Sequence, residues 1–118
     1  MIESAGERLK AWRQLVTFRA MSVAALNNWE PPAAVWADLV FYLPRPKSHY
    51  RTGRYAGMLK DSAPRVHTTK PDGDKLTRAV FDSLTDAGVI TDDSAIYGYR
   101  TLKTYADHHP TGVQITIS

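Results

Sequence analysis

The sequence contains no cysteine, and this absence excludes several kinds of site at once. Without a thiol the chain has no disulfide scaffold, no zinc or iron–sulfur site ligated by cysteine and no cysteine nucleophile. Long apolar runs are also missing, since none approaches the ~18 residues that a membrane-spanning helix needs. No charged-then-apolar leader opens the chain, so the sequence predicts a cytoplasmic protein without a membrane partner.

What is present is typical of one folded domain. The chain has 118 residues, of which 43% are hydrophobic and 23% are charged. These proportions are those of a globular protein rather than a disordered one, and the length favours a single domain over residues 1–118. Internal repeats and low-complexity tracts are absent from the sequence.

The formal net charge of +3 is too small to identify a partner, but its distribution is uneven. Residues 1–43 are net neutral, whereas residues 44–70 carry seven basic residues and one acidic residue, a net +6. Residues 71–118 carry four basic residues and seven aspartates, a net −3. A basic segment that runs directly into an aspartate-rich one is more informative about function than the total charge.

Residue periodicity predicts an α+β fold in which a small mixed or antiparallel sheet packs with two helices. Ser4 and Glu7 have the spacing of a capping box at the start of the first helix. The last two strands are expected to pair as a hairpin, and both faces of the first strand are expected to be largely covered. The predicted elements are a helix over 5–27, a strand over 35–43, a structureless loop over 44–69, a helix over 74–87, and strands over 95–105 and 113–117.

Two pairs of aspartates flank the second predicted helix. Asp72 and Asp74 precede it, and in an extended segment their side chains would point to the same side. Converging carboxylates repel each other unless a cation lies between them, and oxygen ligands suit Mg²⁺ or Mn²⁺. Asp92 and Asp93 follow the helix and could complete such a site. Aspartates also cap helices and fill turns, so the structural interpretation stays open at this point.

Other catalytic patterns are missing. The sequence has no Gly-rich phosphate loop, no dinucleotide-binding fingerprint and no HExxH zinc motif, so no nucleotide cofactor is expected. His108 and His109 are adjacent on a predicted turn and are not expected to share a metal ion. His49 and His67 lie in the basic segment, where phosphate contact and plain solvation are equally plausible.

Residues 70–93, KPDGDKLTRAVFDSLTDAGVITDD, resemble the RusA-type Holliday-junction resolvases, especially versions carried by bacteriophages. The family shows a D-x-D core, a basic residue before alanine in the helix, a D-D pair at this spacing, and then a strand similar to residues 99–103. The segment 46–54 resembles the basic loop of actinobacterial phage members. The resemblance covers roughly residues 36–117 and is most specific over 70–103.

This resemblance implies a homodimeric, Mg²⁺-dependent endonuclease of a bacterial host cell that cuts four-way DNA junctions by paired symmetric nicks, in recombination, repair or phage DNA processing. By position, the three metal-binding acids of the family fall on Asp72, Asp74 and Asp93, and its catalytic lysine falls on Arg78. Supporting positions fall on Asp92, Asp82 and Lys75. DNA contacts are expected from the basic loop, namely Arg45, Lys47, His49, Tyr50, Arg51, Arg54, Lys60, Arg65 and Lys70.

The chain departs from the family pattern in three places. Arg78 keeps the charge of a lysine and can stabilise a developing phosphorane, but it is a poor proton donor. Lys75 stands where many members have asparagine. Family members begin with a β-strand and a Pro-rich turn, so either this chain lacks that strand, which would expose a sheet edge, or its start codon is placed too late.

Three alternatives stay open. A non-catalytic junction-binding module would bind four-way DNA in EDTA and nick it under no divalent ion. A broader flap or fork nuclease would cut asymmetrically, with no preference for four-way over three-way substrates. A structural or regulatory interaction protein would show no salt-dependent affinity for DNA.

Overall fold

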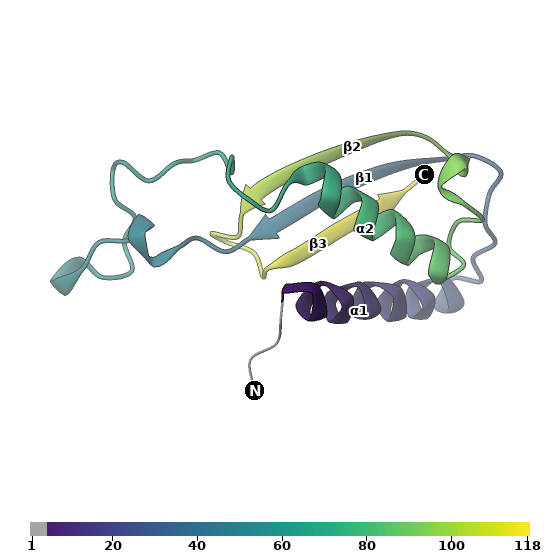
Figure 1. Cartoon of the computed structure of the whole chain (residues 1–118), viewed down its shortest axis with the longest axis horizontal. Helices are drawn as coiled ribbons and strands as arrows, with labels where there is room; N and C mark the ends of the chain where they lie inside the picture. The colour runs from purple at the N-terminus through teal and green to yellow at the C-terminus, as the bar shows by residue number, and fades with distance from the viewer. Residues whose placement is uncertain (1–4) are drawn as a thin grey trace.

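The computed structural model describes residues 5–118 and shows an α+β fold (Figure 1). The helices and strands begin and end within two residues of the predicted bounds. Three short 3₁₀ turns were not predicted: two lie in the predicted loop, and one precedes the second strand. The capping box predicted at Ser4 lies outside the described residues. The elements are α1 (Ala5–Leu26), β1 (Val35–Leu43), η1 (Lys47–His49), η2 (Gly53–Tyr55), α2 (Gly73–Asp86), η3 (Asp93–Ala95), β2 (Ile96–Tyr105) and β3 (Gly112–Ile117).

The sheet is mixed, with the strand order β2-β1-β3. Strand β1 pairs in parallel with β2 and antiparallel with β3, so the predicted hairpin between the last two strands is wrong. The physical reason is that β1 is the strand richest in apolar residues, and the central place gives it a neighbour on both sides. The turn after β2 therefore crosses the end of β1, where the Ala106 amide donates to Leu43 O at 2.8 Å.

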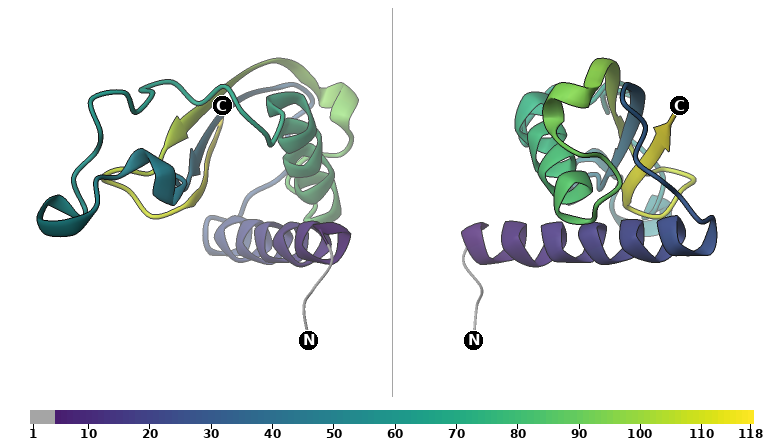
Figure 2. Two further views of the ribbon diagram at one scale, coloured as in Figure 1. Left: turned by 60° about the vertical axis from the view of Figure 1, so that its left-hand side comes forward. Right: turned by 90° about the vertical axis from the view of Figure 1, so that its right-hand side faces the viewer.

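Both helices pack against one face of the sheet. Along β1, Val35, Ala37, Leu39 and Phe41 are at most 1% exposed, whereas the residues between them are half-buried. Trp12 of α1 lies beside Phe41, with ring centroids 6.4 Å apart. The expectation that both faces are covered therefore holds for one face only, because no helix of the described residues lies over the other (Figure 2).

Polar contacts join the last turn of α2 to the middle of α1. Ser83 of α2 is fully buried, and its Oγ lies 2.9 Å from Ala79 O and 3.2 Å from Arg13 O of α1. The Arg13 guanidinium pairs with Asp82 at 3.5 Å. Asp82, which the sequence suggested as support for the metal site, is therefore engaged in the contact between the helices.

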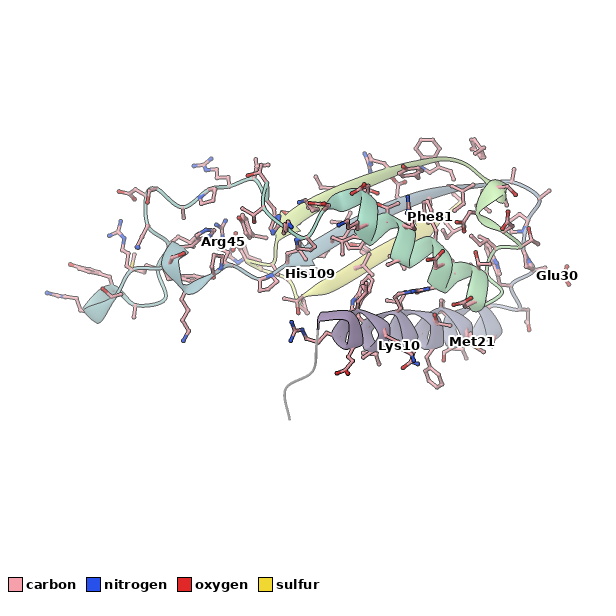
Figure 3. The ribbon with its side chains drawn as sticks, in the orientation of Figure 1. Lys10, Met21, Glu30, Arg45, Phe81 and His109 are labelled. Atoms are coloured by element: carbon pink, nitrogen blue, oxygen red, sulfur yellow. The ribbon has the colours of Figure 1, made fainter. Side chains whose placement is uncertain are left out.

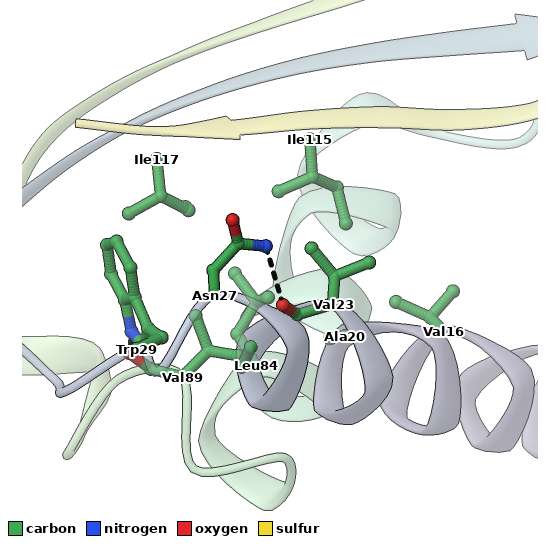
Figure 4. A pocket seen from close by; sticks show the side chains of 10 residues that line it. Val16, Ala20, Val23, Asn27, Trp29, Leu84, Val89, Ile115 and Ile117 are labelled. Carbon is green, nitrogen blue, oxygen red and sulfur yellow. Dashed lines mark hydrogen bonds between the residues drawn. The ribbon is translucent and has the colours of Figure 1, made fainter.

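An apolar groove lies between α1 and β3 (Figure 4). Val16 and Val23 line it from the helix, and Ile115 and Ile117 line it from the strand. Among residues 5–118, β3 pairs with β1 alone, so β3 is an edge of the sheet. In the same part of the chain, no helix is long and apolar enough to cross a lipid bilayer.

Residues 44–70, which we call the basic arm, project from the end of the sheet away from both helices (Figure 1). The predicted loop is more structured than expected, because it contains η1, η2 and an antiparallel bridge between Tyr50 and Leu59. Two backbone hydrogen bonds flank the bridge, from Arg51 N to Met58 O at 2.8 Å and from Lys60 N to His49 O at 2.9 Å. The arm gives the molecule its longest dimension, 54 Å.

Candidate functional site

Asp72 and Asp74 lie at the start of α2, where the basic arm returns to the body of the protein. Asp72 is the residue before the helix, with φ −72° and ψ 139°, and Asp74 is in the first turn. The expectation that both aspartates lie in an extended segment is therefore wrong, since only Asp72 is extended. A carboxylate at this position normally caps the helix, but the Asp72 side chain makes no capping hydrogen bond. It is 51% exposed and lies 4.0 Å from Lys75 Nζ.

Asp74 and Arg78 share one exposed face of α2. They are four residues apart, so their side chains lie one helical turn from each other. Asp74 Oδ1 accepts a hydrogen bond from the Lys75 amide at 2.9 Å, and the residue is exposed. Arg78 has no ion-pair partner among the described residues. A phosphate held near Asp74 would therefore be within reach of a free guanidinium.

Strand β2 holds this first turn of α2 through two hydroxyl groups. Thr77 Oγ1 donates to Gly73 O at 2.7 Å and lies 2.7 Å from Thr101 Oγ1 of β2. Because each hydroxyl has one hydrogen, Thr101 must donate to Thr77. The backbone between the two aspartates is thus tethered to a strand of the central sheet.

Asp92 and Asp93 lie at the opposite end of α2. Asp92 accepts hydrogen bonds from Ser94 N at 3.2 Å and Ser94 Oγ at 2.7 Å, which lower its pKa, and it caps the turn η3. Asp93 Oδ1 accepts from Thr85 Oγ1 at 3.1 Å. Thr85 is eleven residues beyond Asp74, which corresponds to about 16 Å along the helix.

The structure therefore does not bring all the predicted metal ligands together in one chain. Asp72 and Asp74 are neighbours, but Asp93 is separated from them by most of the length of α2. Within residues 5–118, no three histidine or acidic side chains gather closely enough to hold a metal ion. One chain alone therefore does not bring Asp72, Asp74 and Asp93 to one ion, and a metal site made by these three residues stays a prediction.

Arg45 was expected to contact DNA, but the structure makes it an anchor of the basic arm (Figure 3). Its side chain is only 4% exposed and forms two hydrogen bonds with the Asp107 carboxylate, at 2.6 and 3.0 Å. Another nitrogen donates to Pro64 O at 2.6 Å, and the guanidinium lies 4.0 Å from the centre of the Tyr105 ring. The Asp107 hydrogen bonds raise the pKa of Arg45 and lower that of Asp107. Arg45 is therefore unavailable to a phosphate.

We expect Arg45→Met to destabilise the fold by about 3 kcal/mol, because it leaves the Asp107 carboxylate and Pro64 O without their partner. Urea unfolding at pH 7 measures this loss. Arg65→Met, the same substitution at an exposed position of the arm, should change stability by less than about 0.5 kcal/mol. Equal losses for the two variants would contradict an anchoring role for Arg45.

The other predicted DNA contacts divide into three groups. His49 is half-buried with its ring nearly perpendicular to that of Tyr105, and Tyr50 is half-buried and forms the bridge with Leu59. Arg51 is paired with Asp61 at 3.1 Å, an exposed pair that DNA phosphates can replace. The remaining five cations are exposed and have no ion-pair partner within residues 5–118, and they are Lys47, Arg54, Lys60, Arg65 and Lys70.

His67 is buried at the base of the arm and is 7% exposed. Its ring packs against Tyr105 with centroids 4.8 Å apart, and its Nδ1 has no hydrogen-bond partner in the part of the chain that the structure describes. Burial lowers the pKa of His67 below its usual 6.5, and the nearby Lys103 ammonium lowers it further. The folded protein therefore holds His67 in its neutral form at pH 7.

This pKa makes stability dependent on pH near neutrality. Below about pH 6.5 the unfolded chain takes up a proton at His67 that the folded chain does not, so the free energy of unfolding falls as the pH falls. We expect His67→Leu to reduce this loss between pH 7.5 and 5.5 in urea unfolding. An identical pH dependence in the wild type and the variant would show that His67 is not held neutral by the fold.

Sequence reasoning missed three residues that organise this region. Tyr105 and Asp107 hold Arg45, and Lys103 contacts the backbone just before Asp72. Lys103 belongs to the strand that resembles the family, but no sequence signal indicated any of these contacts, because the partners are 32 to 62 residues away along the chain. The result is a pair of accessible carboxylates next to an anchored cationic arm, which is an arrangement suited to binding a phosphate backbone and a divalent cation together.

Comparison with known proteins agrees with this arrangement. The family model of the endodeoxyribonuclease RusA matches residues 4–118, which is nearly the whole chain. None of the curated proteins matches the sequence. Because the family model covers the sheet, both helices, the basic arm and the aspartates at both ends of α2, the chain belongs to the RusA endodeoxyribonuclease family.

Proposed function

We propose that the protein is a Mg²⁺-dependent endonuclease that resolves four-way DNA junctions by paired symmetric nicks. Membership of the RusA family makes it a nuclease that acts on branched DNA. The observation that carries the finer proposal is the position of Asp72 and Asp74, two carboxylates free of helix capping, directly where the basic arm ends. The proposal places the reaction in the cytoplasm of a bacterial host cell, in recombination, repair or phage DNA processing.

The donor set fits a hard divalent cation. Asp72 and Asp74 offer carboxylate oxygens, which Mg²⁺ and Mn²⁺ prefer, and the sequence has no cysteine whose thiolate would favour zinc. When bound there, the ion would supply charge for the scissile phosphate and lower the pKa of the attacking water. Lys75, 4.0 Å from Asp72, would limit the repulsion between the carboxylates before the metal binds.

Arg78 is proposed to neutralise charge on the phosphate that undergoes cleavage. It lies one turn along α2 from Asp74, on the exposed side of the helix, and it forms no ion pair with a carboxylate within residues 5–118. A guanidinium can hold two phosphate oxygens at once, and it stays charged throughout the reaction. Its role is therefore electrostatic, and the proton required by the leaving oxygen comes from another source, such as water.

We further propose that a second copy of the chain completes the site. Asp93 lies about 16 Å along α2 from Asp74, so a single chain cannot bring the two carboxylates to one ion. If two copies place α2 antiparallel across a two-fold axis, the start of each helix lies near the end of the other. Asp93 of one copy then joins Asp72 and Asp74 of the other. Two such sites in one dimer suit a reaction that nicks two strands.

A labelled immobile four-way junction distinguishes this proposal from its alternatives. We expect binding in EDTA and paired nicks in Mg²⁺ or Mn²⁺, with three-way and flap substrates cut less efficiently. A junction-binding module without activity would bind in EDTA and give no nick with either ion. A broader nuclease would cut three-way junctions and flaps equally well and asymmetrically, and a structural protein would bind none of these substrates.

The exposed cations of the basic arm are expected to provide most of the affinity for DNA. Lys47→Ala combined with Arg65→Ala should weaken junction binding about tenfold near 0.1 M salt and reduce the slope of log K against log salt by about 2, because two phosphate contacts are lost. Lys10→Ala combined with Arg19→Ala is the charge-matched control on the exposed side of α1. If both pairs changed the slope equally, net charge and not the arm would determine the affinity.

A further inference from the structure

One ammonium group holds both the end of the basic arm and the start of α2. Lys103 extends from β2, and its Nζ donates to Thr69 O at 2.8 Å and to Pro71 O at 2.9 Å. Thr69 is near the end of the arm, and Pro71 immediately precedes Asp72. Among the described residues, Lys103 forms no ion pair with a carboxylate, so these two carbonyl groups are its hydrogen-bond partners.

The segment that Lys103 holds has little else to fix it. Within residues 5–118, no backbone–backbone hydrogen bond involves Thr69, Lys70 or Pro71. The first backbone hydrogen bond of α2 runs from Leu76 N to Asp72 O at 3.1 Å, after this segment. The direction of the Asp72 carboxylate therefore depends on a stretch of chain whose carbonyl groups are fixed by one side chain.

From this geometry we infer that Lys103 is a positioning residue for the proposed metal site. It acts through the backbone, because its hydrogen bonds are to carbonyl groups and not to Asp72 itself. Charge-assisted hydrogen bonds of an ammonium are stronger than those between neutral groups, and Lys103 is anchored on a strand of the central sheet. The same side chain links the arm, which binds DNA, to the carboxylates that bind the ion. This inference rests on the function proposed above.

The neighbouring residue on the same face of β2 supports this role. Thr101 tethers Gly73 through Thr77, while Lys103 tethers Pro71, so β2 fixes the backbone on both sides of Asp72. Thr101 acts through a chain of two neutral hydroxyl groups, whereas Lys103 contacts two carbonyl groups directly. We therefore expect Lys103 to contribute more to the position of Asp72.

Lys103→Met tests the inference because it keeps the length of the side chain and removes its donors. We expect the single-turnover nicking rate at limiting Mg²⁺ to fall about 30-fold, since small displacements of catalytic groups have effects of this size. The Mg²⁺ concentration for half-maximal nicking should rise several-fold, and junction Kd should change less than about twofold. Lys103→Arg, which keeps a cationic donor, should recover most of the loss, and Lys10→Met on α1 should behave as the wild type.

A second measurement is independent of activity. The amide of Leu76, bonded to Asp72 O, should exchange its hydrogen at least about tenfold faster in Lys103→Met, while amides in the middle of α1 keep their wild-type rates. If the wild type nicks junctions and Lys103→Met keeps the wild-type rate, Mg²⁺ midpoint and Leu76 exchange, this inference alone is overturned. If the wild type nicks no junction in Mg²⁺ or Mn²⁺, the proposed function fails, and the positioning role fails with it.

Discussion

Asp72→Asn should lower the rate of junction nicking about 1,000-fold and leave junction binding nearly unchanged. The substitution replaces one charged oxygen donor by a neutral amide, so a Mg²⁺ ion at the start of α2 would lose a large part of its binding energy. A loss of about 4 kcal/mol in transition-state stabilisation corresponds to a rate decrease of this size. Single-turnover nicking of a labelled junction measures the rate, and a gel-shift titration in EDTA measures the affinity.

The fold should tolerate this change. Asparagine is as good as aspartate before a helix, and the Asp72 side chain makes no capping hydrogen bond to lose. Glu30→Gln is the matched control, since it removes one carboxylate without changing shape at an exposed loop position before β1 (Figure 3). If Asp72→Asn nicked junctions at the wild-type rate in Mg²⁺, Asp72 would not belong to the proposed site. A large decrease of the nicking rate in Glu30→Gln would show that the assay responds to the loss of any negative charge.

The second prediction concerns two inactive variants that restore activity when combined. If Asp93 of one copy joins Asp72 of the other, a heterodimer of Asp72→Asn and Asp93→Asn has one doubly substituted site and one intact site. We expect both homodimers to be inactive and the purified heterodimer to make single nicks. The nicks should be unpaired, because each heterodimer retains one working site.

Two differently tagged copies, co-expressed and purified through both tags, supply the heterodimer for this measurement. The wild type carrying the same two tags is the control, and it should make paired nicks. A heterodimer as inactive as its parents, with the tagged wild type active, would contradict a site shared between copies. That result would favour a metal site completed within each chain, by a second ion or by a third ligand other than Asp93.

Much of the fold followed from the sequence because it depends on local periodicity. The 3.6-residue spacing of apolar side chains located both helices. Gly88 follows the end of α2 with a positive φ of 74°, the conformation that a glycine favours after a helix. The pairing of strands was predicted less well. Whether β3 pairs with β2 or with β1 depends on contacts between residues far apart, such as Ile115 opposite Leu39, which periodicity does not encode.

In the candidate site, too, features that depend on nearby residues were predicted better than contacts between distant ones. Asp72 and Asp74 are neighbours in the sequence and in the structure. Asp93 was assigned to their site although the predicted helix over 74–87 lies between them and already implied a separation of about 20 Å. Arg45 was predicted to contact DNA like the other cations of the basic arm. Its burial follows from Asp107, which is 62 residues away, and no local pattern distinguishes an anchoring arginine from one that binds phosphate.

The most direct test of the central claim is cleavage of a cruciform extruded from a supercoiled plasmid. A dimer with two sites should nick both strands across the junction before it dissociates, so in Mg²⁺ the account predicts linear plasmid as the main product, and in EDTA no product. Arg78→Ala should slow both nicks together. A wild-type protein that gives only relaxed circles, or leaves the plasmid intact in both Mg²⁺ and Mn²⁺, would contradict the assignment of this chain as a junction-resolving endonuclease with paired sites.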